Sequence, residues 1–335
     1  MNGRDKNVLA LYLYITTTNI LKVRELNKKI IHLLKASTVV LGWSLTPVVG
    51  DYLIDQKAQL SPYQLAFFRY FIAAIALFVI LQFQKGFENK QIITSLKNKW
   101  KAYLLVSVAA AGMPVLLFVA VKNPATDGSS ASFLLNANII LIPIVAFFIL
   151  REKIRKSYAI ALSISLVGLF LVIFDESLFD IGNFSLGSIS GNLLAFGSGF
   201  CWALYTVLLK KYFSEDNPLL VTFLSLLMGS FYLVFFAFLI PPIGMSLDFL
   251  GIFLVIVIAV LSTSLAYSFW LDILGYLSTT QTGMIQAMVP LLSVVWAVSF
   301  LGDSVSYIFG IGAVLIVTSI IIVETRRTEQ PEIEN

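Results

Sequence analysis

The chain of 335 residues is 58% hydrophobic and only 13% charged, which leaves too little polar surface to cover a soluble core. Its formal net charge of +4 does not indicate nucleic-acid binding, because the basic residues lie mainly in short loops between apolar segments. The only cysteine, Cys201, excludes a disulfide within the chain, and the only histidine, His32, leaves little scope for metal chemistry. We therefore expect an integral membrane protein that binds no metal, cofactor or nucleic acid.

Residues 1–32 precede the first long apolar segment. They contain a short apolar run at 8–15, which is too short to cross a membrane that needs about 20 residues. A basic stretch follows, and no small-residue cleavage site precedes the first span, so we predict no signal peptide. The sequence predicts a cytoplasmic amino-terminal segment here, and leaves open whether it is an interfacial segment or an over-long gene start.

Ten apolar segments then follow in close succession. Each has about 20 residues, the length of a helix that crosses the hydrocarbon layer. They are apolar at both odd and even positions, whereas strands of a membrane barrel alternate in polarity. The sequence predicts an all-α membrane protein with a polar cytoplasmic tail at 324–335. The expected spans are 33–50, 63–83, 102–121, 129–150, 157–174, 191–209, 219–240, 250–271, 281–300 and 305–323.

One segment occurs twice, at 127–153 and at 278–304. Each copy has a Ser/Thr-rich entry, an apolar run and an acidic residue, so that Glu152 aligns with Asp303 and Leu135 with Gln286. A long-range repeat of this kind indicates two halves of similar structure. We place the repeats at 33–174 and 191–323, joined by an outer linker at 175–190. Five spans per repeat is an odd number, which predicts that the two copies have inverted topology.

Basic residues indicate the orientation of this bundle. If the amino terminus is cytoplasmic, only Lys57 and Lys122 of the 23 Lys and Arg residues fall in outer segments. Arg69 lies inside the second span, and the others lie in or beside cytoplasmic segments. Cytoplasmic loops carry such an excess of positive charge. We expect both termini in the cytoplasm and the chain in the plasma membrane.

Both halves carry a set of landmarks at matching places. The first half has Trp43 in its first span and the run PYQLAFFR at 62–69. The second half has the stretch GNLLAFGSGFCWALYTVLLKK at 191–211, and Pro290 followed by Asp303. With glycines 168, 310 and 312, which we expect to allow close approach of helices, these landmarks resemble the EamA branch of the drug/metabolite transporter superfamily, which usually has Glu in place of Asp303. The resemblance implies a secondary transporter of small metabolites or hydrophobic compounds.

The sequence departs from this pattern at three places. Ile139 occupies the family's usual proline position, with Pro143 one turn later, and Ser44 and Ser319 stand where glycine is usual. These departures concern the shape of a central pocket more than the fold. We assign structural or gating roles to Arg69, Pro143, Glu152, Pro290 and Asp303.

Polar side chains inside the spans are the candidate binding groups, because lipid cannot satisfy their hydrogen bonds. Asn136 and Asn138 lie two residues apart, about 200° around a regular helix, so we expect them not to share a face. Trp43 and Trp202 each lie in the first helix of a repeat and could wall a cavity; packing and helix-to-helix bonding are the alternatives for all of these groups. The candidate substrate-binding residues are Trp43, Thr46, Asn136, Asn138, Trp202, Tyr205, Tyr267 and Gln286. The hydroxyl run at 262–264 either joins helices or faces the same cavity.

Arg69 is the one charged side chain well inside an expected span, about two turns or ~10 Å from its outer end. Placing an arginine in a span costs at least about 2.5 kcal/mol, which suggests an ion-path or substrate role. Alternatively, the side chain extends to the outer face or ties its span to Asp51 or Asp55. We favour the structural alternative, because the outer face is close.

The motifs of common enzymes are missing from the sequence. It has no P-loop and no HExxH pattern, and the expected spans hold no histidine that could activate a serine. Acidic residues lie in loops or at span ends, which favours facilitated diffusion or exchange over proton coupling. We expect a transporter that works without ATP and exports a small neutral or zwitterionic metabolite, such as an amino acid, or a hydrophobic compound, by alternating access. The alternative is a scaffold or sensor that does not transport; the expected partners are substrate and membrane lipid, and a homodimer is left open.

Overall fold

The computed structural model describes residues 30–123, 126, 128–151, 156–174, 186–240, 244–274 and 279–328, and within them it is helical with no strand. Ten rods of helix follow one another, and each overlaps one of the ten expected spans, which confirms the predicted fold class. Three rods contain or end in a π-helical segment, and a turn interrupts a fourth. The first helix, Ile30–Gln56, ends in η1 (Tyr52–Gln56), and the rods that follow are α2 (Pro62–Gln82), α3 (Asn89–Val121), α4 (Gly128–Asn136) with α5 (Asn138–Leu150), α6 (Lys156–Phe174), α7 (Leu186–Phe213), α8 (Pro218–Leu239), α9 (Phe249–Ala259) with η3 (Val260–Leu265) and α10 (Ala266–Leu274), α11 (Thr279–Trp296) with η4 (Ala297–Leu301), and α12 (Tyr307–Thr328).

Two equivalent helices, α2 and α8, begin with the same local device. The Ser61 hydroxyl accepts a hydrogen bond from the Gln64 backbone N–H, and the Ser61 backbone N–H donates to the Gln64 side-chain oxygen, with Pro62 in the first turn. The Asn217 side chain likewise accepts from the backbone N–H groups of Leu219 and Leu220, which follow Pro218. Such caps satisfy amides that the first turn of a helix leaves unpaired, and proline fits there because it lacks that donor.

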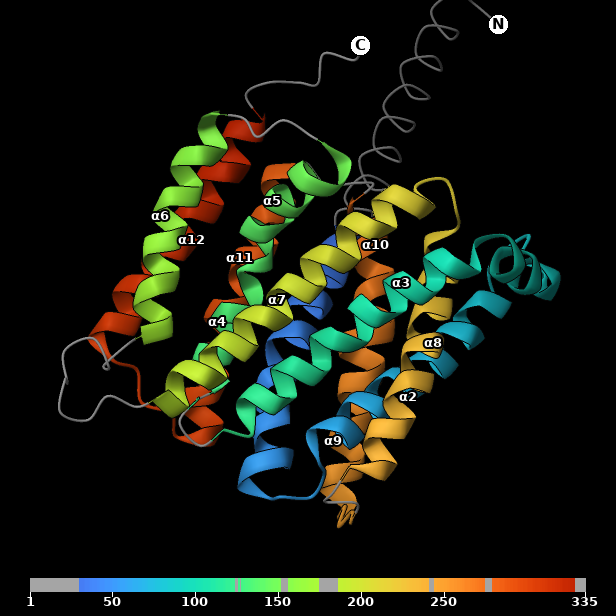
Figure 1. The fold of residues 1–335 in the computed structure, drawn as a ribbon, viewed down its shortest axis with the longest axis horizontal. Helices are drawn as coiled ribbons and strands as arrows, with labels where there is room; N and C mark the ends of the chain where they lie inside the picture. Colours follow the sequence, from blue (N-terminus) through green and yellow to red (C-terminus); the bar gives the residue numbers. More distant parts are fainter. Residues whose placement is uncertain are drawn as a thin grey trace, which may run out of the picture.

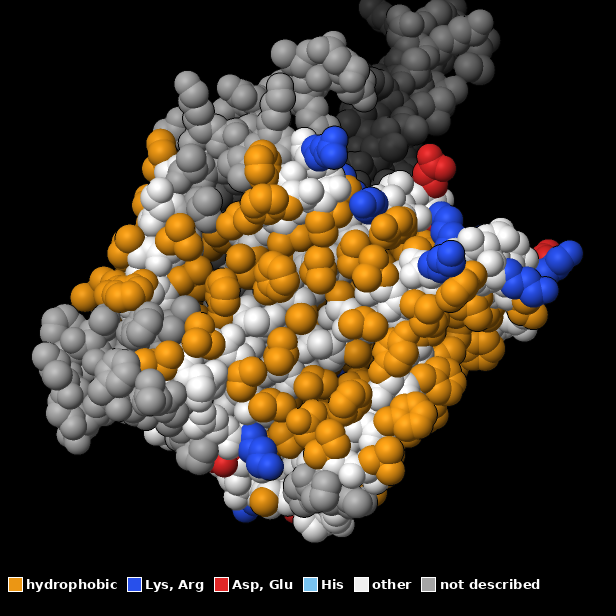
Figure 2. Space-filling model, viewed as in Figure 1, with side chains coloured by type: hydrophobic (Ala, Val, Ile, Leu, Met, Phe, Trp, Pro, Cys, Tyr) orange, Lys and Arg blue, Asp and Glu red, His pale blue; other side chains and the backbone are white. Residues whose placement is uncertain are grey.

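Length and composition allow six of these helices to cross a membrane outright, and four further helices have shorter apolar cores. Figure 2 shows hydrophobic side chains over much of the flanks in this view, with most Lys and Arg toward the ends of the bundle. Phe231, Phe235 and Phe148 are 62%, 64% and 73% exposed. Soluble proteins rarely expose apolar surface on this scale, so these flanks form the lipid-facing surface of an integral membrane protein.

Equivalent helices of the two halves pack against each other, α2 with α8 and α6 with α12, and the latter pair lies side by side in Figure 1. At the α6–α12 crossing, a Cβ added to Gly168 would lie 2.7 Å from the carbonyl oxygen of Gly312. The expected close approach at these two glycines is confirmed. It is wrong for Gly310, where an added Cβ would meet nothing within 4 Å.

The expected cytoplasmic loop at 84–101 is largely helical, because α3 already begins at Asn89. Its backbone leaves helical geometry at Lys99, where φ is −127° and ψ is 24°. The Lys99 ammonium donates to the Tyr212 carbonyl at 2.9 Å and pairs with Asp216. The kink at Lys99 therefore lies beside the end of α7 and the loop between α7 and α8.

Candidate functional site

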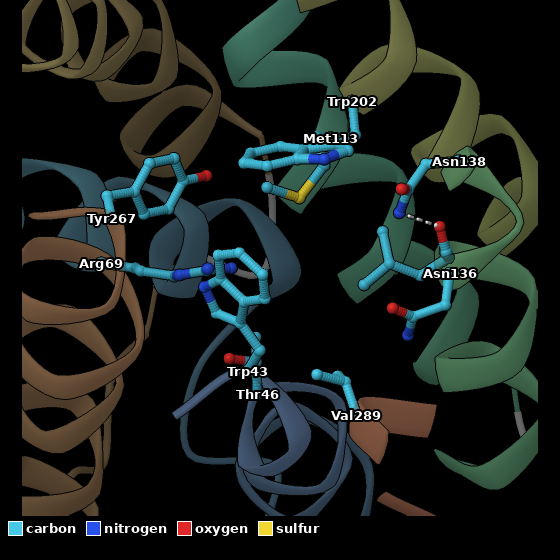
Figure 3. Close-up of a pocket in the computed structure, with 10 residues that line it drawn as sticks. Trp43, Thr46, Arg69, Met113, Asn136, Asn138, Trp202, Tyr267 and Val289 are labelled. Carbon is cyan, nitrogen blue, oxygen red and sulfur yellow. Dashed lines mark hydrogen bonds between the residues drawn. The ribbon is translucent and has the colours of Figure 1, made fainter. Parts of the chain in front are cut away.

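A pocket lies where helices of the two halves meet in the interior (Figure 3). The first helix, α2, α3, α4 and α5 contribute residues from one half, and α7, α10 and α11 from the other. The lining residues are Trp43, Thr46, Arg69, Met113, Leu135, Asn136, Asn138, Trp202, Tyr267 and Val289. The cavity volume open to water is about 60 Å³. Since one water needs about 10–15 Å³ on this measure, the pocket holds a few waters in this conformation.

Aromatic rings form one wall of the pocket. Trp43 and Trp202 meet edge to face with ring centroids 6.2 Å apart, and Tyr267 lies 5.3 Å from Trp202 and 6.2 Å from Trp43. Pairs in this geometry attract beyond their buried area by about 0.5–1.5 kcal/mol, which holds the wall in place. Tyr205 packs against Trp202 at 5.5 Å but does not reach the lining, so it supports the wall from behind.

The fourth rod breaks in the middle, between α4 and α5. Asn136 ends α4, Asn138 begins α5, and the turn at Ala137 separates them. Both asparagines line the pocket, so the expectation that they cannot share a face is wrong: it assumed an unbroken helix. The Asn138 amide donates to the Leu135 carbonyl at 2.8 Å, the dashed bond in Figure 3, and so satisfies an acceptor near the break.

Arg69 does not extend to the outer face as expected. Its side chain is 2% exposed and lines the pocket, and Figure 3 shows it extending toward the cavity on the side where Tyr267 and Trp43 lie. Its Nε donates to the hydroxyl of Thr263 at 2.9 Å. The expected tie to Asp51 or Asp55 is not among the ion pairs between described residues, which join His32 and Lys35 to Asp272 and Lys99 to Asp216.

Of the two alternatives for the hydroxyl run at 262–264, joining helices or facing the cavity, the structure shows the first. It lies in the π-helical segment η3. Ser262 bonds with Thr46 of the first helix, Thr263 with Arg69 of α2, and Ser264 with a carbonyl of α2 at 3.0 Å. Segments of π-helix often occur at functional sites. Here the segment directs three successive hydroxyls to neighbouring helices that line the pocket.

The remaining candidates lie away from the pocket lining or outside the described residues. Pro143 lies within α5, Pro290 is buried within α11, and Asp303 follows η4. Glu152 and the side chain of Gln286 lie outside the described part of the structure. Sequence reasoning missed three apolar lining residues, because apolar side chains in a span carry no signal that distinguishes pocket from lipid. They are Met113, Leu135 and Val289.

Comparison with known proteins decides the family. The profile of the EamA-like transporter family matches the chain twice, at residues 30–174 and 189–325. The chain belongs to the EamA-like transporter family. It is therefore a multi-pass membrane transporter of the drug/metabolite transporter superfamily, which confirms the resemblance stated above.

Several known proteins are similar to this chain in sequence at low identity. The uncharacterized transporter YyaM of Bacillus subtilis is 26% identical over 264 residues, covering 78% of this chain and 84% of the relative. A probable amino-acid metabolite efflux pump of Salmonella typhimurium is 24% identical over 222 residues, covering 63% and 72%. The threonine/homoserine exporter RhtA of Escherichia coli is 31% identical over 130 residues, covering 38% and 43%.

One solved crystal structure superimposes with a TM-score of 0.60 at 19% identity, covering 89% of this chain and 99% of that one. This likeness supports the fold of the EamA-like chain and carries no information on its substrate.

Proposed function

We propose that this EamA-like transporter exports a small neutral or zwitterionic metabolite, such as an amino acid, through the pocket between Trp43 and Trp202. One observation carries the proposal: the pocket is built by helices of both halves at the place where they meet. Inverted-repeat transporters bind substrate at this junction and expose it to each side in turn as one half rocks against the other. We place the two repeats at 33–174 and 191–323.

The lining supports a compact metabolite with both apolar and polar parts. Trp43, Trp202 and Tyr267 offer aromatic surface, and the amides of Asn136 and Asn138 offer donors and acceptors. A phosphorylated ligand would need several cations, and the described lining offers one guanidinium. The small volume open in this conformation means that the pocket must widen to admit an amino acid.

Names of relatives point the same way without deciding the substrate. One relative is named a probable amino-acid metabolite efflux pump and another a threonine/homoserine exporter. Both matches are remote or partial, so the amino-acid assignment for this chain is our proposal. Export of a hydrophobic compound is a second candidate, favoured by the ring cluster that Trp43 forms with Trp202, Tyr267 and Trp270.

Energy coupling follows from the charges near the pocket. No carboxylate is among the described lining residues, and a proton relay through the membrane needs such groups. We infer facilitated diffusion or exchange without ATP. The distribution of basic residues supports an orientation in the plasma membrane with both termini in the cytoplasm. The ion pair of Lys35 with Asp272 joins the first helix to α10 near that face.

Counterflow into proteoliposomes tests the proposal. Purified protein in vesicles preloaded with unlabelled amino acids should take up the matching radiolabelled amino acid faster than empty vesicles do. Trp202→Ala should abolish most of this uptake because it removes the wall of the pocket. Phe231→Ala removes a ring from the lipid-facing surface, where Phe231 is 62% exposed, and should leave the uptake intact.

Two outcomes would contradict the proposed export of an amino acid. If no amino acid and no hydrophobic dye crosses the membrane above the rate of empty vesicles, although the protein is folded, the chain is a scaffold or sensor. Uptake of dyes alone would favour the second candidate function.

A further inference from the structure

We propose that Arg69 binds the carboxylate of the transported substrate, so that the pocket selects small monocarboxylic acids such as α-amino acids. The proposal rests on the transport function above and goes further, because it assigns a binding group and the chemical feature that this group recognises. It replaces the structural role first expected for Arg69.

The guanidinium of Arg69 is held with its ends toward the cavity. α2 places Arg69 about two turns beyond the cap at Ser61. Its Nε donates to the Thr263 hydroxyl at 2.9 Å, and that hydroxyl donates to the Ile258 carbonyl at 3.1 Å. Thr263 is therefore engaged as both donor and acceptor, which fixes the Nε end of the guanidinium. A planar guanidinium fixed at Nε holds its remaining N–H groups in one fixed plane.

One nitrogen of the Arg69 guanidinium lacks a hydrogen-bond partner among the described residues. Nη1 of Arg69 is buried and donates no hydrogen bond to a described residue, and the side chain as a whole is 2% exposed. Arg69 belongs to none of the ion pairs between described residues, and the other described residues of the lining are uncharged. A buried charge without a partner is strongly unfavourable. A ligand that brings a negative group would supply the missing partner.

A carboxylate fits this arrangement better than the other common anions. Two parallel N–H···O bonds can join a guanidinium and a carboxylate, and the charges cancel one for one. A phosphate carries more charge than one guanidinium neutralises. A neutral ligand leaves the guanidinium uncompensated. The single cation in the described lining therefore selects a ligand with one carboxylate.

The rest of the lining defines the remainder of the ligand. Trp43 and Tyr267 lie on the same side of the pocket as Arg69 in Figure 3, and the amides of Asn136 and Asn138 lie on the opposite side. An ammonium group is attracted to the faces of Trp and Tyr rings and can donate to amide oxygens. An α-amino acid with its carboxylate on Arg69 would thus find complementary groups for its amine within the same pocket.

The test compares each acid with its own amide. Protein reconstituted in phosphatidylcholine–phosphatidylglycerol vesicles is assayed by counterflow with the common L-amino acids, and each transported acid is compared with its α-amide. Affinity is followed in parallel by ligand-induced thermal shift. The wild-type protein should prefer acid to amide by roughly 10- to 100-fold, the effect of hydrogen bonds to a charged group.

Variants then assign this preference to Arg69. Arg69→Gln should lower the acid-to-amide ratio toward one. Arg69→Lys keeps the charge but loses the planar fork, and should give an intermediate ratio. Lys122→Gln removes one positive charge at an exposed position and should leave the ratio unchanged. A structural role for Arg69 would lower the yield of folded protein but not the ratio, and Arg69→Lys decides the question if Arg69→Gln does not fold.

Each outcome bears on one of the two proposals. Equal transport of acid and amide by the wild-type protein, or an unchanged ratio in both Arg69 variants, overturns the role of Arg69 and leaves transport intact. Transport of hydrophobic dyes without any amino acid does the same. Transport of no probe at all overturns the proposed function and this inference with it.

Discussion

The crossing of α6 and α12 predicts that two glycines of one helix respond differently to the same substitution. A Cβ at Gly312 would lie 2.8 Å from the carbonyl oxygen of Gly168 and 2.8 Å from Cγ2 of Val172. A Cβ at Gly310 would meet nothing within 4 Å. Gly312→Ala must therefore separate the two helices, whereas Gly310→Ala adds its methyl group in open space.

The size of the effect follows from these distances. Ordinary contacts of a Cβ begin at 3.4 Å, so an approach of 2.8 Å requires a shift of about 0.6 Å. Adding a methyl group to a well-packed contact costs about 1–3 kcal/mol. Alanine also favours a helix over glycine by about 0.8–1 kcal/mol, and this gain is common to both variants. We expect Gly312→Ala to be less stable than Gly310→Ala by about 1–3 kcal/mol.

Thermal unfolding in one detergent at one scan rate measures this difference. The comparison between the two alanine variants cancels the helix-propensity gain, which a comparison with the wild-type protein would not do. Gly312→Ala should melt several degrees below Gly310→Ala. If the two variants melt together, α6 and α12 do not cross as closely as their glycines indicate, and the account of this interface is wrong.

Three further predictions concern topology, binding and turnover. A cysteine at Lys97 should react with an impermeant thiol reagent only from the cytoplasmic side and one at Asp248 only from outside, in a background without the native Cys201; the reverse pattern would contradict the assigned orientation. Asn138→Leu should weaken substrate binding in ligand-induced thermal shift without lowering the yield of folded protein, because it removes an amide from the pocket; binding as tight as in the parent would show that this amide only closes the helix break. Pro290→Ala restores a backbone donor within α11 and should slow counterflow while leaving affinity unchanged; an unchanged rate would exclude Pro290 as a bending point.

The ten spans and the aromatic wall could be predicted from the sequence because both depend on local features. An apolar run of fixed length reports a membrane helix wherever it occurs. Trp43 and Trp202 could be found because each lies in the first helix of a repeat, and a repeat relates positions without any knowledge of contacts. The structure places both rings on the pocket lining.

That both asparagines line the pocket could not be predicted, because it depends on a helix break that the residues at the turn do not indicate. Ala137 is a strong helix former, and neither glycine nor proline is adjacent to it. Pro143 lies further along and removes the amide that would bond to the carbonyl of Ile139, so it weakens the helix on one side of the break. An unbroken helix was the reasonable expectation, and it gave the wrong relation between Asn136 and Asn138.

The direction in which the Arg69 side chain points could not be predicted either, for a different reason. The position of its span suggested an outer-face partner, and Asp51 and Asp55 were the nearest acids in the sequence. The residue that fixes its side chain is Thr263, which lies in the other half of the chain and reaches Arg69 only through packing between the halves. A contact between residues so far apart in the sequence can be predicted only where the repeat relates the two positions. The repeat does not relate Arg69 to Thr263.

Departures from regular helix explain why the binding groups gather at this junction. A regular helix uses its own backbone donors and acceptors, so inside a membrane it offers neighbours only side chains at fixed angles. The break at Ala137 separates α4 from α5, and two nearby amides on either side of it line one pocket; η3 turns consecutive hydroxyls toward different helices. Both irregular segments lie in rods that line the pocket or fix its residues. Such segments are less stable than regular helix and persist because surrounding contacts hold them. The same contacts must change when the halves rock, so the segments that build the site are also those in which we expect the transport cycle to bend the chain.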